Sequence, residues 1–172
     1  MNKSDLLLQK LPLILQWIDM TLKAHAPYAR SIADFGFHEI PKYFSKETLD
    51  SVKIIAINKI PVPPLTEMGL NQLGDFENGI YAGITYLNTY FLLNQEVHNE
   101  ALHFHELCHV VQWKYLGIDK FLMVYALGLL QYGYRNSPLE VMAYEYQNIF
   151  ENKATPFDIE KQIIDKLAGS PI

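Results

Sequence analysis

The stretch EVHNEALHFHELCHVVQWKYL, Glu96–Leu116, decides how the rest of the chain is interpreted. Its apolar residues recur at helical spacing and Gly117 follows it, which favours an α-helix that ends at a glycine cap. Inside the stretch lies the pattern H-E-x-x-H, from His105 to His109. Side chains four residues apart lie on one face of a helix, one turn apart, so both imidazoles can reach the same metal ion.

Glu106 flanks these two histidines. With 3.6 residues per turn, it lies about 100° around the helix axis from His105 and about 60° from His109. It can therefore contact a metal-bound water without binding the metal, as the general base of a zinc hydrolase does. The alternative is a helix whose histidines are only core or surface polar groups.

Three further potential ligands lie in the same stretch. His103 comes two residues before His105 and points to nearly the opposite side of the helix, so it is interpreted as a packing or solvent-facing residue. His98 faces the same way as His105 but lies about 10 Å along the axis, which favours a helix-start residue over a role beside the substrate. Cys108 is interpreted as a small buried residue, although a thiolate could bind zinc.

A catalytic zinc site usually has three protein ligands and one open position. The arrangement with a third histidine ten residues after the first, and a glycine seven after it, is excluded because Tyr115 and Gln112 occupy those positions. A glutamate from a later helix is the other common arrangement. Glu140 opens a helix expected at 138–150, which follows one expected at 120–131, and helices joined by a short connection pack together.

Glu140 also has a purely structural interpretation. Ser137-Pro-Leu-Glu140 has the form of a capping box, with serine at the N-cap, proline at N1 and glutamate at N3. The sequence alone does not decide whether Glu140 caps the helix or binds the metal. We expect the ligand, because the zinc site otherwise lacks its carboxylate, and Glu145 is the reserve candidate.

These residues resemble the gluzincin branch of the zincin metallopeptidases, especially the small zincin-like domains of bacterial contractile-injection- and toxin-associated proteins. His105–Gln112 is similar to their HELxHVVQ run, and Ala82–Leu92 resembles the β-hairpin before their active-site helix. Glu140 and Ala143 match an E-x-x-A-D setting, but Tyr144 stands where many relatives carry an aspartate that orients a zinc-bound histidine.

The resemblance covers roughly 79–150 and implies an α+β, zincin-like minimal metallopeptidase fold. In such a fold a small sheet with a hairpin packs on the HExxH helix beside further helices.

The chain has 172 residues, enough for one domain with a sizeable core. We expect a single domain over 1–172, with an N-terminal helix and strand in 1–60 and the catalytic core in 79–150.

Periodicity predicts the elements before this core. Apolar residues at helical spacing predict a helix from Ser4 to about Ala24, with a kink or a late start at Pro12. A run rich in β-branched residues predicts a strand over 52–60. The proline-rich segment after it opens a loop over 61–77, for which a linker to a separate domain is the alternative.

The predicted hairpin over 79–93 has its turn at Leu87-Asn88. An exposed strand beside a zinc helix can pair with an extended substrate through main-chain hydrogen bonds. Thr85, Tyr86 and Asn88 would then lie near the cleft. A plain hairpin without a functional role is the equal alternative.

The expected chemistry is hydrolysis of a peptide or amide bond. Zn²⁺ held by His105, His109 and Glu140 lowers the pKa of its water toward about 7. Glu106 takes that proton as the water attacks a carbonyl carbon and passes it to the leaving amine. The expected substrate is a peptide or protein, and Tyr144 is taken as the second catalytic residue. It is one of four candidates near Glu140 for stabilising the oxyanion: Tyr132, Tyr134, Arg135 and Tyr144.

Two other functions are compatible with the sequence. One is a catalytically inactive zincin-like domain that binds metal or another protein. The other is a metal-free domain that binds a partner through its aromatic-rich surface. The missing aspartate at Tyr144 favours the inactive zincin-like domain over an active hydrolase.

Composition excludes several classes of protein. The formal charge of −5 and the absence of a basic run argue against a nucleic-acid partner. The apolar run Phe121–Leu130 is about half the length of a membrane span, and Gln9 and Lys10 interrupt the only candidate for a signal peptide. With a single cysteine, the chain is expected to be a soluble, cytoplasmic protein, and its oligomeric state is left open.

Overall fold

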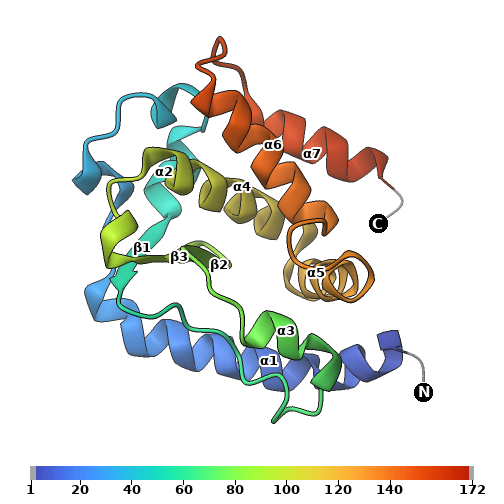
Figure 1. Cartoon of the computed structure of the whole chain (residues 1–172). Coiled ribbons are helices and arrows are strands. Elements are labelled where there is room, and N and C mark those ends of the chain that lie inside the picture. The colour runs from blue at the N-terminus through green and yellow to red at the C-terminus, as the bar shows by residue number, and fades with distance from the viewer. Residues whose placement is uncertain (1–2, 171–172) are drawn as a thin grey trace.

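The computed structural model describes residues 3–170, which form a mixed α+β fold with seven α-helices and one three-stranded sheet (Figure 1). The helices are α1 (Lys3–His25), α2 (Lys46–Ser51), α3 (Gly74–Glu77), α4 (Glu100–Leu116), α5 (Ile118–Tyr132), α6 (Pro138–Glu151) and α7 (Ile159–Gly169). The strands are β1 (Lys53–Ile57), β2 (Gly83–Tyr86) and β3 (Thr89–Leu93). Short 3-10 helices cover Ala26–Tyr28, Ile32–Phe35, Ile40–Lys42, Asn71–Leu73 and Asn94–Glu96. The expected α+β class is confirmed.

The sheet has the order β1-β3-β2, so β2 lies at one edge. β1 runs parallel to β3, whereas β2 and β3 form the predicted antiparallel hairpin with its turn at Leu87-Asn88. Leu87 takes a φ of 59° there, a left-handed conformation that is uncommon for a leucine. The strand predicted over 52–60 is shorter than expected, because pairing with β3 ends at Ile57 opposite Leu93.

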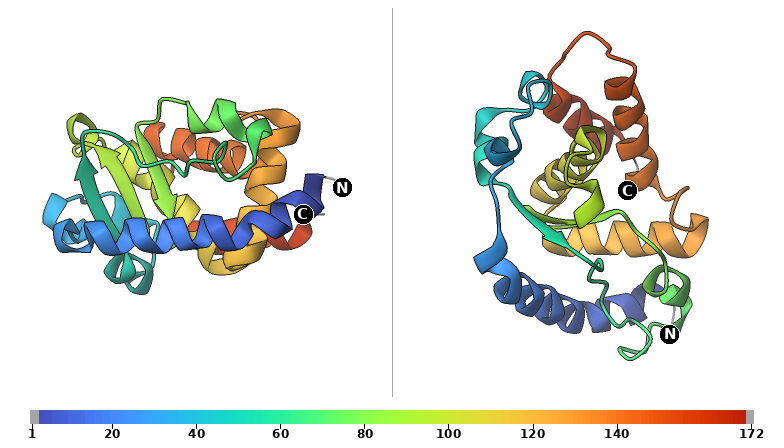
Figure 2. Two further views of the ribbon diagram at one scale, coloured as in Figure 1. Left: turned by 90° about the horizontal axis from the view of Figure 1, so that it is seen from below. Right: turned by 60° about the vertical axis from the view of Figure 1, so that its left-hand side comes forward.

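Helices cover both faces of the sheet (Figure 2). On the α1 side, Trp17 packs edge-on against Tyr86 and His25 against Phe91. On the α4 side, Thr85 of β2 contacts the helix through a hydrogen bond. Alternation along the strands explains this division, because successive side chains point to opposite faces.

α1 passes through Pro12 without interruption, so the expected late start at that residue is wrong. A proline inside a helix removes one hydrogen bond, here the bond to the carbonyl of Leu8. Leu8 is 55% exposed, so water can satisfy the freed carbonyl. The buried face of the helix, with Ile14 and Ile18, stays intact and packs in the core.

The helix that carries the HExxH pattern begins later than predicted. Asn94–Glu96 is a 3-10 turn, and Asn99 caps α4 by accepting a hydrogen bond from the backbone N–H of Leu102. The predicted end is confirmed: Gly117 follows with a φ of 75°, and its N–H donates to the carbonyl of Trp113. Only a residue tolerant of positive φ lets α5 start directly after α4.

α4 is the central element of the fold. α6 and α7 pack against one side of it, and β2 lies against another. The sequence reasoning missed α7, although Ile159, Ile163 and Leu167 recur every fourth residue and are fully or nearly fully buried. No helix in the described part of the chain is long and apolar enough to cross a membrane.

Candidate metal centre

The structure brings together three of the residues singled out in the sequence. His105 and His109 project from α4 and Glu140 from the first turn of α6, and one ligand atom of each lies within 4.8 Å of the others. The Nε2 atoms of the two histidines are 3.1 Å apart. Each is 3.3 Å from an oxygen of Glu140, His105 from Oε2 and His109 from Oε1. All three residues are at most 5% exposed.

These separations fit a metal ion. Ligand atoms about 2.0–2.1 Å from zinc in a tetrahedral site lie about 3.3 Å from each other. The distance between the two ring nitrogens and the two distances from a ring nitrogen to a carboxylate oxygen are close to that value. In addition, Glu140 Oε2 is a buried oxygen without a hydrogen-bond donor, which an ion at this point would satisfy.

Glu140 does not act as a helix cap. Ser137 occupies the N-cap position of α6, but its side chain makes no capping hydrogen bond, and its Oγ has no partner. The backbone N–H of Ser137 donates to the carbonyl of Tyr134 and not to the Glu140 carboxylate. The carboxylate is therefore free to face His105 and His109, and the capping box allowed by the sequence is not formed.

Charge interactions shift the pKa values of this cluster in opposite directions. Burial alone would lower the pKa of His109, but the neighbouring Glu140 carboxylate outweighs burial and raises it to about 9. Burial alone would raise the pKa of Glu140, yet His109 and His105 together hold it below its ordinary value. In the metal-free protein, a proton on His109 thus takes the place of an ion.

Gln112 fixes the orientation of the His109 ring. Its Oε1 lies 2.8 Å from His109 Nδ1, and its Nε2 donates to the carbonyl of Leu139 at 3.0 Å. The amide therefore links α4 to the start of α6, one residue before Glu140. Sequence reasoning used Gln112 only to exclude a different ligand pattern; its position three residues after His109, on the same helix face, was the available signal.

Tyr125 of α5 contacts the cluster from another side. Its hydroxyl donates to Glu140 Oε1 at 2.6 Å, and burial followed by the Glu140 charge raises its pKa well above the ordinary value. A helix was expected over 120–131, but Tyr125 was not among the candidate residues. No sequence pattern links Tyr125 with Glu140, because their contact depends on how α5 and α6 pack.

Glu106 lies beside the cluster but points to the sheet. Its Oε2 accepts a hydrogen bond of 2.6 Å from the hydroxyl of Thr85 on β2. A Cβ atom on Gly83 would lie 2.5 Å from Glu106 Oε1, so only a glycine leaves room for the carboxylate. Burial raises the pKa of Glu106, and the charges of His105 and His109 only partly offset that effect.

Tyr144 packs on the remaining histidine. Its ring centroid is 4.5 Å from that of His105, and the Arg135 guanidinium lies 5.3 Å from the Tyr144 centroid on the surface. The Nδ1 atom of His105 is buried without a hydrogen-bond partner. An aspartate at position 144 is what the resemblance expects for orienting such a ring; Tyr144 supplies packing against it instead.

The other candidates lie apart from the metal ligands. His98 is exposed outside α4, and Tyr132 is exposed at the end of α5. Cys108 is fully buried, and burial raises the pKa of its thiol well above the ordinary value. Glu145, the reserve ligand, forms a surface ion pair with Lys166 of α7.

His103 packs on the opposite side of α4 from the cluster. Its Nδ1 lies 2.8 Å from the hydroxyl of Tyr90, and its Nε2 lies 3.0 Å from the carbonyl of Val97. Both ring nitrogens are thus used by internal contacts, and the aromatic rings of Phe35 and Phe37 lie against it. The packing interpretation is confirmed, and the solvent-facing one is wrong.

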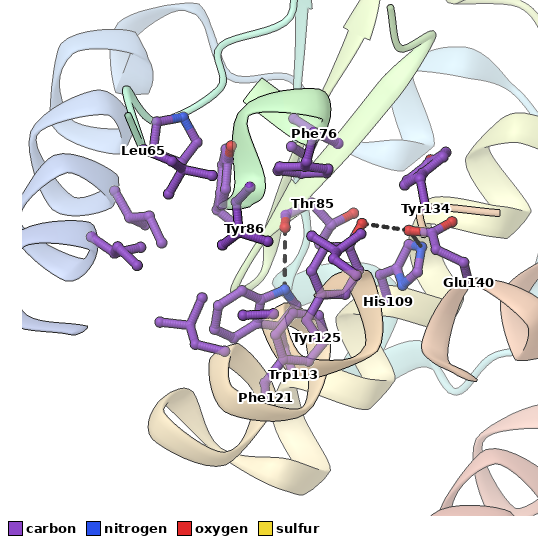
Figure 3. Close-up of a pocket in the computed structure, with 18 of the residues that line it drawn as sticks. Leu65, Phe76, Thr85, Tyr86, His109, Trp113, Phe121, Tyr125, Tyr134 and Glu140 are labelled. Atoms are coloured by element: carbon purple, nitrogen blue, oxygen red, sulfur yellow. Dashed lines mark hydrogen bonds and ion pairs between the residues drawn. The ribbon is translucent and has the colours of Figure 1, made fainter. Parts of the chain in front are cut away.

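A pocket lined by β2 reaches the cluster (Figure 3). It encloses about 800 Å³ of space between atoms, including the part open to solvent. Glu106, His109 and Glu140 line one end, with Tyr134 beside them. Its other end is apolar, and this apolar arm is formed by facing side chains of α1 and α5: Leu7, Leu11, Ile14, Ile18, Leu122 and Ala126.

The hairpin contributes to this pocket, but not in the form of a free edge. Thr85 and Tyr86 line the pocket, as expected. Asn88, in the turn of the hairpin, instead donates a hydrogen bond to the carbonyl of Ser51. The Trp113 indole N–H donates to the Thr85 carbonyl at 3.2 Å. One of the backbone acceptors that an extended peptide would use is therefore already bonded.

Comparison of the chain with protein-family models, with curated proteins and with solved structures found no match. The geometry of the site and the chemistry of its residues therefore carry the functional assignment proposed below.

Proposed function

We propose that this protein is a zinc-dependent hydrolase of peptide or amide bonds, with a minimal zincin-like fold. The observation that carries the proposal is the position of Glu106. Its buried carboxylate lines the same end of the pocket as His109 and Glu140, yet it does not belong to the group of converging ligand atoms. A carboxylate beside three ligands, at the end of a pocket, fits a general base better than a fourth ligand of a closed structural site.

The donor set supports zinc as the ion. Two imidazole nitrogens and one carboxylate form the ligand set of many catalytic zinc sites. When bound there, zinc acts as a Lewis acid that polarises a carbonyl group and lowers the pKa of water toward about 7. The same donors also suit non-haem iron, so elemental analysis is part of the test.

The residues of the chain supply the remaining functions. Glu106 accepts a proton from the attacking water and delivers it to the leaving amine, and burial raises its pKa above the ordinary value. Thr85 and Gly83 hold its carboxylate in place. Of the four oxyanion candidates, Tyr134 is the one that lines the pocket, whereas Tyr144 packs against His105.

A zincin-like domain that binds metal without hydrolysis is the second candidate. One observation favours it: the buried Nδ1 of His105 has no partner, so this ring lacks the hydrogen bond that usually orients a catalytic ligand. In that case Glu106 would have no role in turnover.

Two measurements test the proposal. We expect one zinc per chain in the purified protein, loss of zinc in His109→Ala and Glu140→Ala, and no loss in Glu145→Ala, which removes only a surface ion pair. Glu106→Gln is expected to keep zinc and to lose at least about a hundredfold in turnover of a responsive amide substrate. Retained zinc with unchanged turnover in Glu106→Gln would disprove the general-base assignment, and absence of zinc would disprove the metal site.

A further inference from the structure

The pocket has two chemically different ends. At one end lie the polar side chains of the metal centre, and the apolar arm extends from there past β2 to α1 (Figure 3). α1 faces the arm with Leu7, Leu11, Ile14 and Ile18, which are spaced so that they share one side of the helix. Nothing in the proposed hydrolysis requires an apolar extension of this length.

Polar groups along the arm are already bonded within the protein. The Tyr86 hydroxyl donates to the carbonyl of Pro61, and the Tyr81 hydroxyl to that of Phe76. Trp113 donates to the Thr85 carbonyl. A peptide main chain entering the arm would lose its hydrogen bonds to water and find few in return, which is unfavourable. An aliphatic chain has no such groups to satisfy.

We infer that the arm binds a linear aliphatic chain and that the substrate is an N-acyl amide whose acyl chain lies in it. The inference builds on the proposed function and narrows its substrate class. With the chain between α1 and α5, the acyl carbonyl reaches the end of the pocket where Glu106, His109 and Glu140 lie. Both walls of the arm are formed by packed helices, α1 and α5.

The reaction is a hydrolysis without any co-reactant other than water. The water oxygen forms a bond to the acyl carbon, and the bond between that carbon and the amide nitrogen breaks. Glu106 carries one proton from water to the departing nitrogen. The products are a fatty carboxylate, which keeps the apolar chain, and a free amine.

The test measures binding of linear alkyl hydroxamic acids of increasing chain length to the whole protein, with and without zinc. Trp113 lines the pocket, so its fluorescence in a Trp17→Phe background reports chain entry without any turnover. We expect affinity to rise by about fourfold per added methylene until the arm is filled. This slope is expected to persist in the metal-free protein, at lower overall affinity.

Ala126→Phe places a ring in the arm and is expected to abolish the dependence on chain length. Ala24→Phe makes the same change at an exposed position of α1 and is the matched control. Equal affinity for short and long chains in the zinc-loaded protein would overturn the inference and leave the proposed hydrolase intact. So would equally tight binding of a short hydroxamate with a branched, leucine-like side chain. A chain-length slope without zinc binding would retain the aliphatic site but refute the zinc hydrolase.

Discussion

The hydroxyl of Thr85, on the edge strand β2, donates a 2.6 Å hydrogen bond to the carboxylate of Glu106 on α4. The contact joins the hairpin to the helix that carries the metal ligands. It also opposes part of the effect of burial, because this hydrogen bond lowers the pKa of Glu106 while burial raises it. Thr85 is thus a positioning residue for the proposed general base.

Replacing Thr85 with valine keeps the shape of the side chain and removes the donor. Without it, the pKa of Glu106 rises further, so the base is protonated at a higher pH. We expect the acidic limb of the kcat/KM profile to move to higher pH and activity near neutrality to fall about tenfold. Thr89→Val on β3, a buried threonine outside the site, is the control. An unchanged pH profile would show that the hydrogen bond has no functional role.

Gln112→Leu tests the orientation of the His109 ring. The substitution leaves His109 Nδ1 and the Leu139 carbonyl without their side-chain partner. Loss of a group that orients a metal ligand typically lowers metal affinity by about 10- to 100-fold. We expect that loss in a zinc competition titration, with no change for Gln131→Leu at the exposed end of α5. Equal affinities in both variants would contradict the orienting role.

Zinc binding is expected to release protons. In the metal-free protein Glu140 raises the pKa of His109 to about 9, so near neutral pH the ring carries a proton that a metal ion must displace. Calorimetry in buffers of different ionisation enthalpy should give about one proton per zinc, and affinity should fall as the pH decreases from about 9. Binding heats that do not depend on the buffer would contradict this prediction.

The raised pKa of His109 also affects the stability of the metal-free protein. The pKa of His109 is higher in the folded than in the unfolded state, so its contribution is complete below the ordinary value of 6.5 and is lost as the pH rises through about 9. Urea titrations of the metal-free protein across this range should show the decline. His109→Ala should remove it.

For His103 we expect the opposite dependence of stability on pH. Burial lowers its pKa from 6.5 to about 4, so the unfolded chain binds a proton that the folded protein excludes. Stability should therefore fall as the pH decreases from 6.5 to about 4, with a limit of about 3 kcal/mol. In urea titrations His103→Gln should reduce this slope, whereas His38→Gln, at an exposed residue that does not shift the pKa of His103, should keep it. Equal slopes in both variants would contradict the assignment.

The sequence by itself determined the part of the site that lies within α4. A spacing of four residues on a helix fixes the side on which His105 and His109 project, and Gly117 fixes where that helix ends, because both depend only on helix geometry. The hairpin with its turn at Leu87-Asn88 was expected from the resemblance, and the antiparallel pairing of β2 with β3 confirms it. Periodicity also contained the signal for α7, which was overlooked.

Only the tertiary structure decided the rest. Whether Glu140 caps α6 or faces the histidines depends on how α6 packs against α4, and both outcomes satisfy the local sequence. The contacts of Thr85 with Glu106 and of Tyr125 with Glu140 join segments that no periodicity relates. The apolar arm likewise needs α1 and α5, more than a hundred residues apart in sequence, to face each other. Such contacts arise from packing of the whole core, which no single segment encodes.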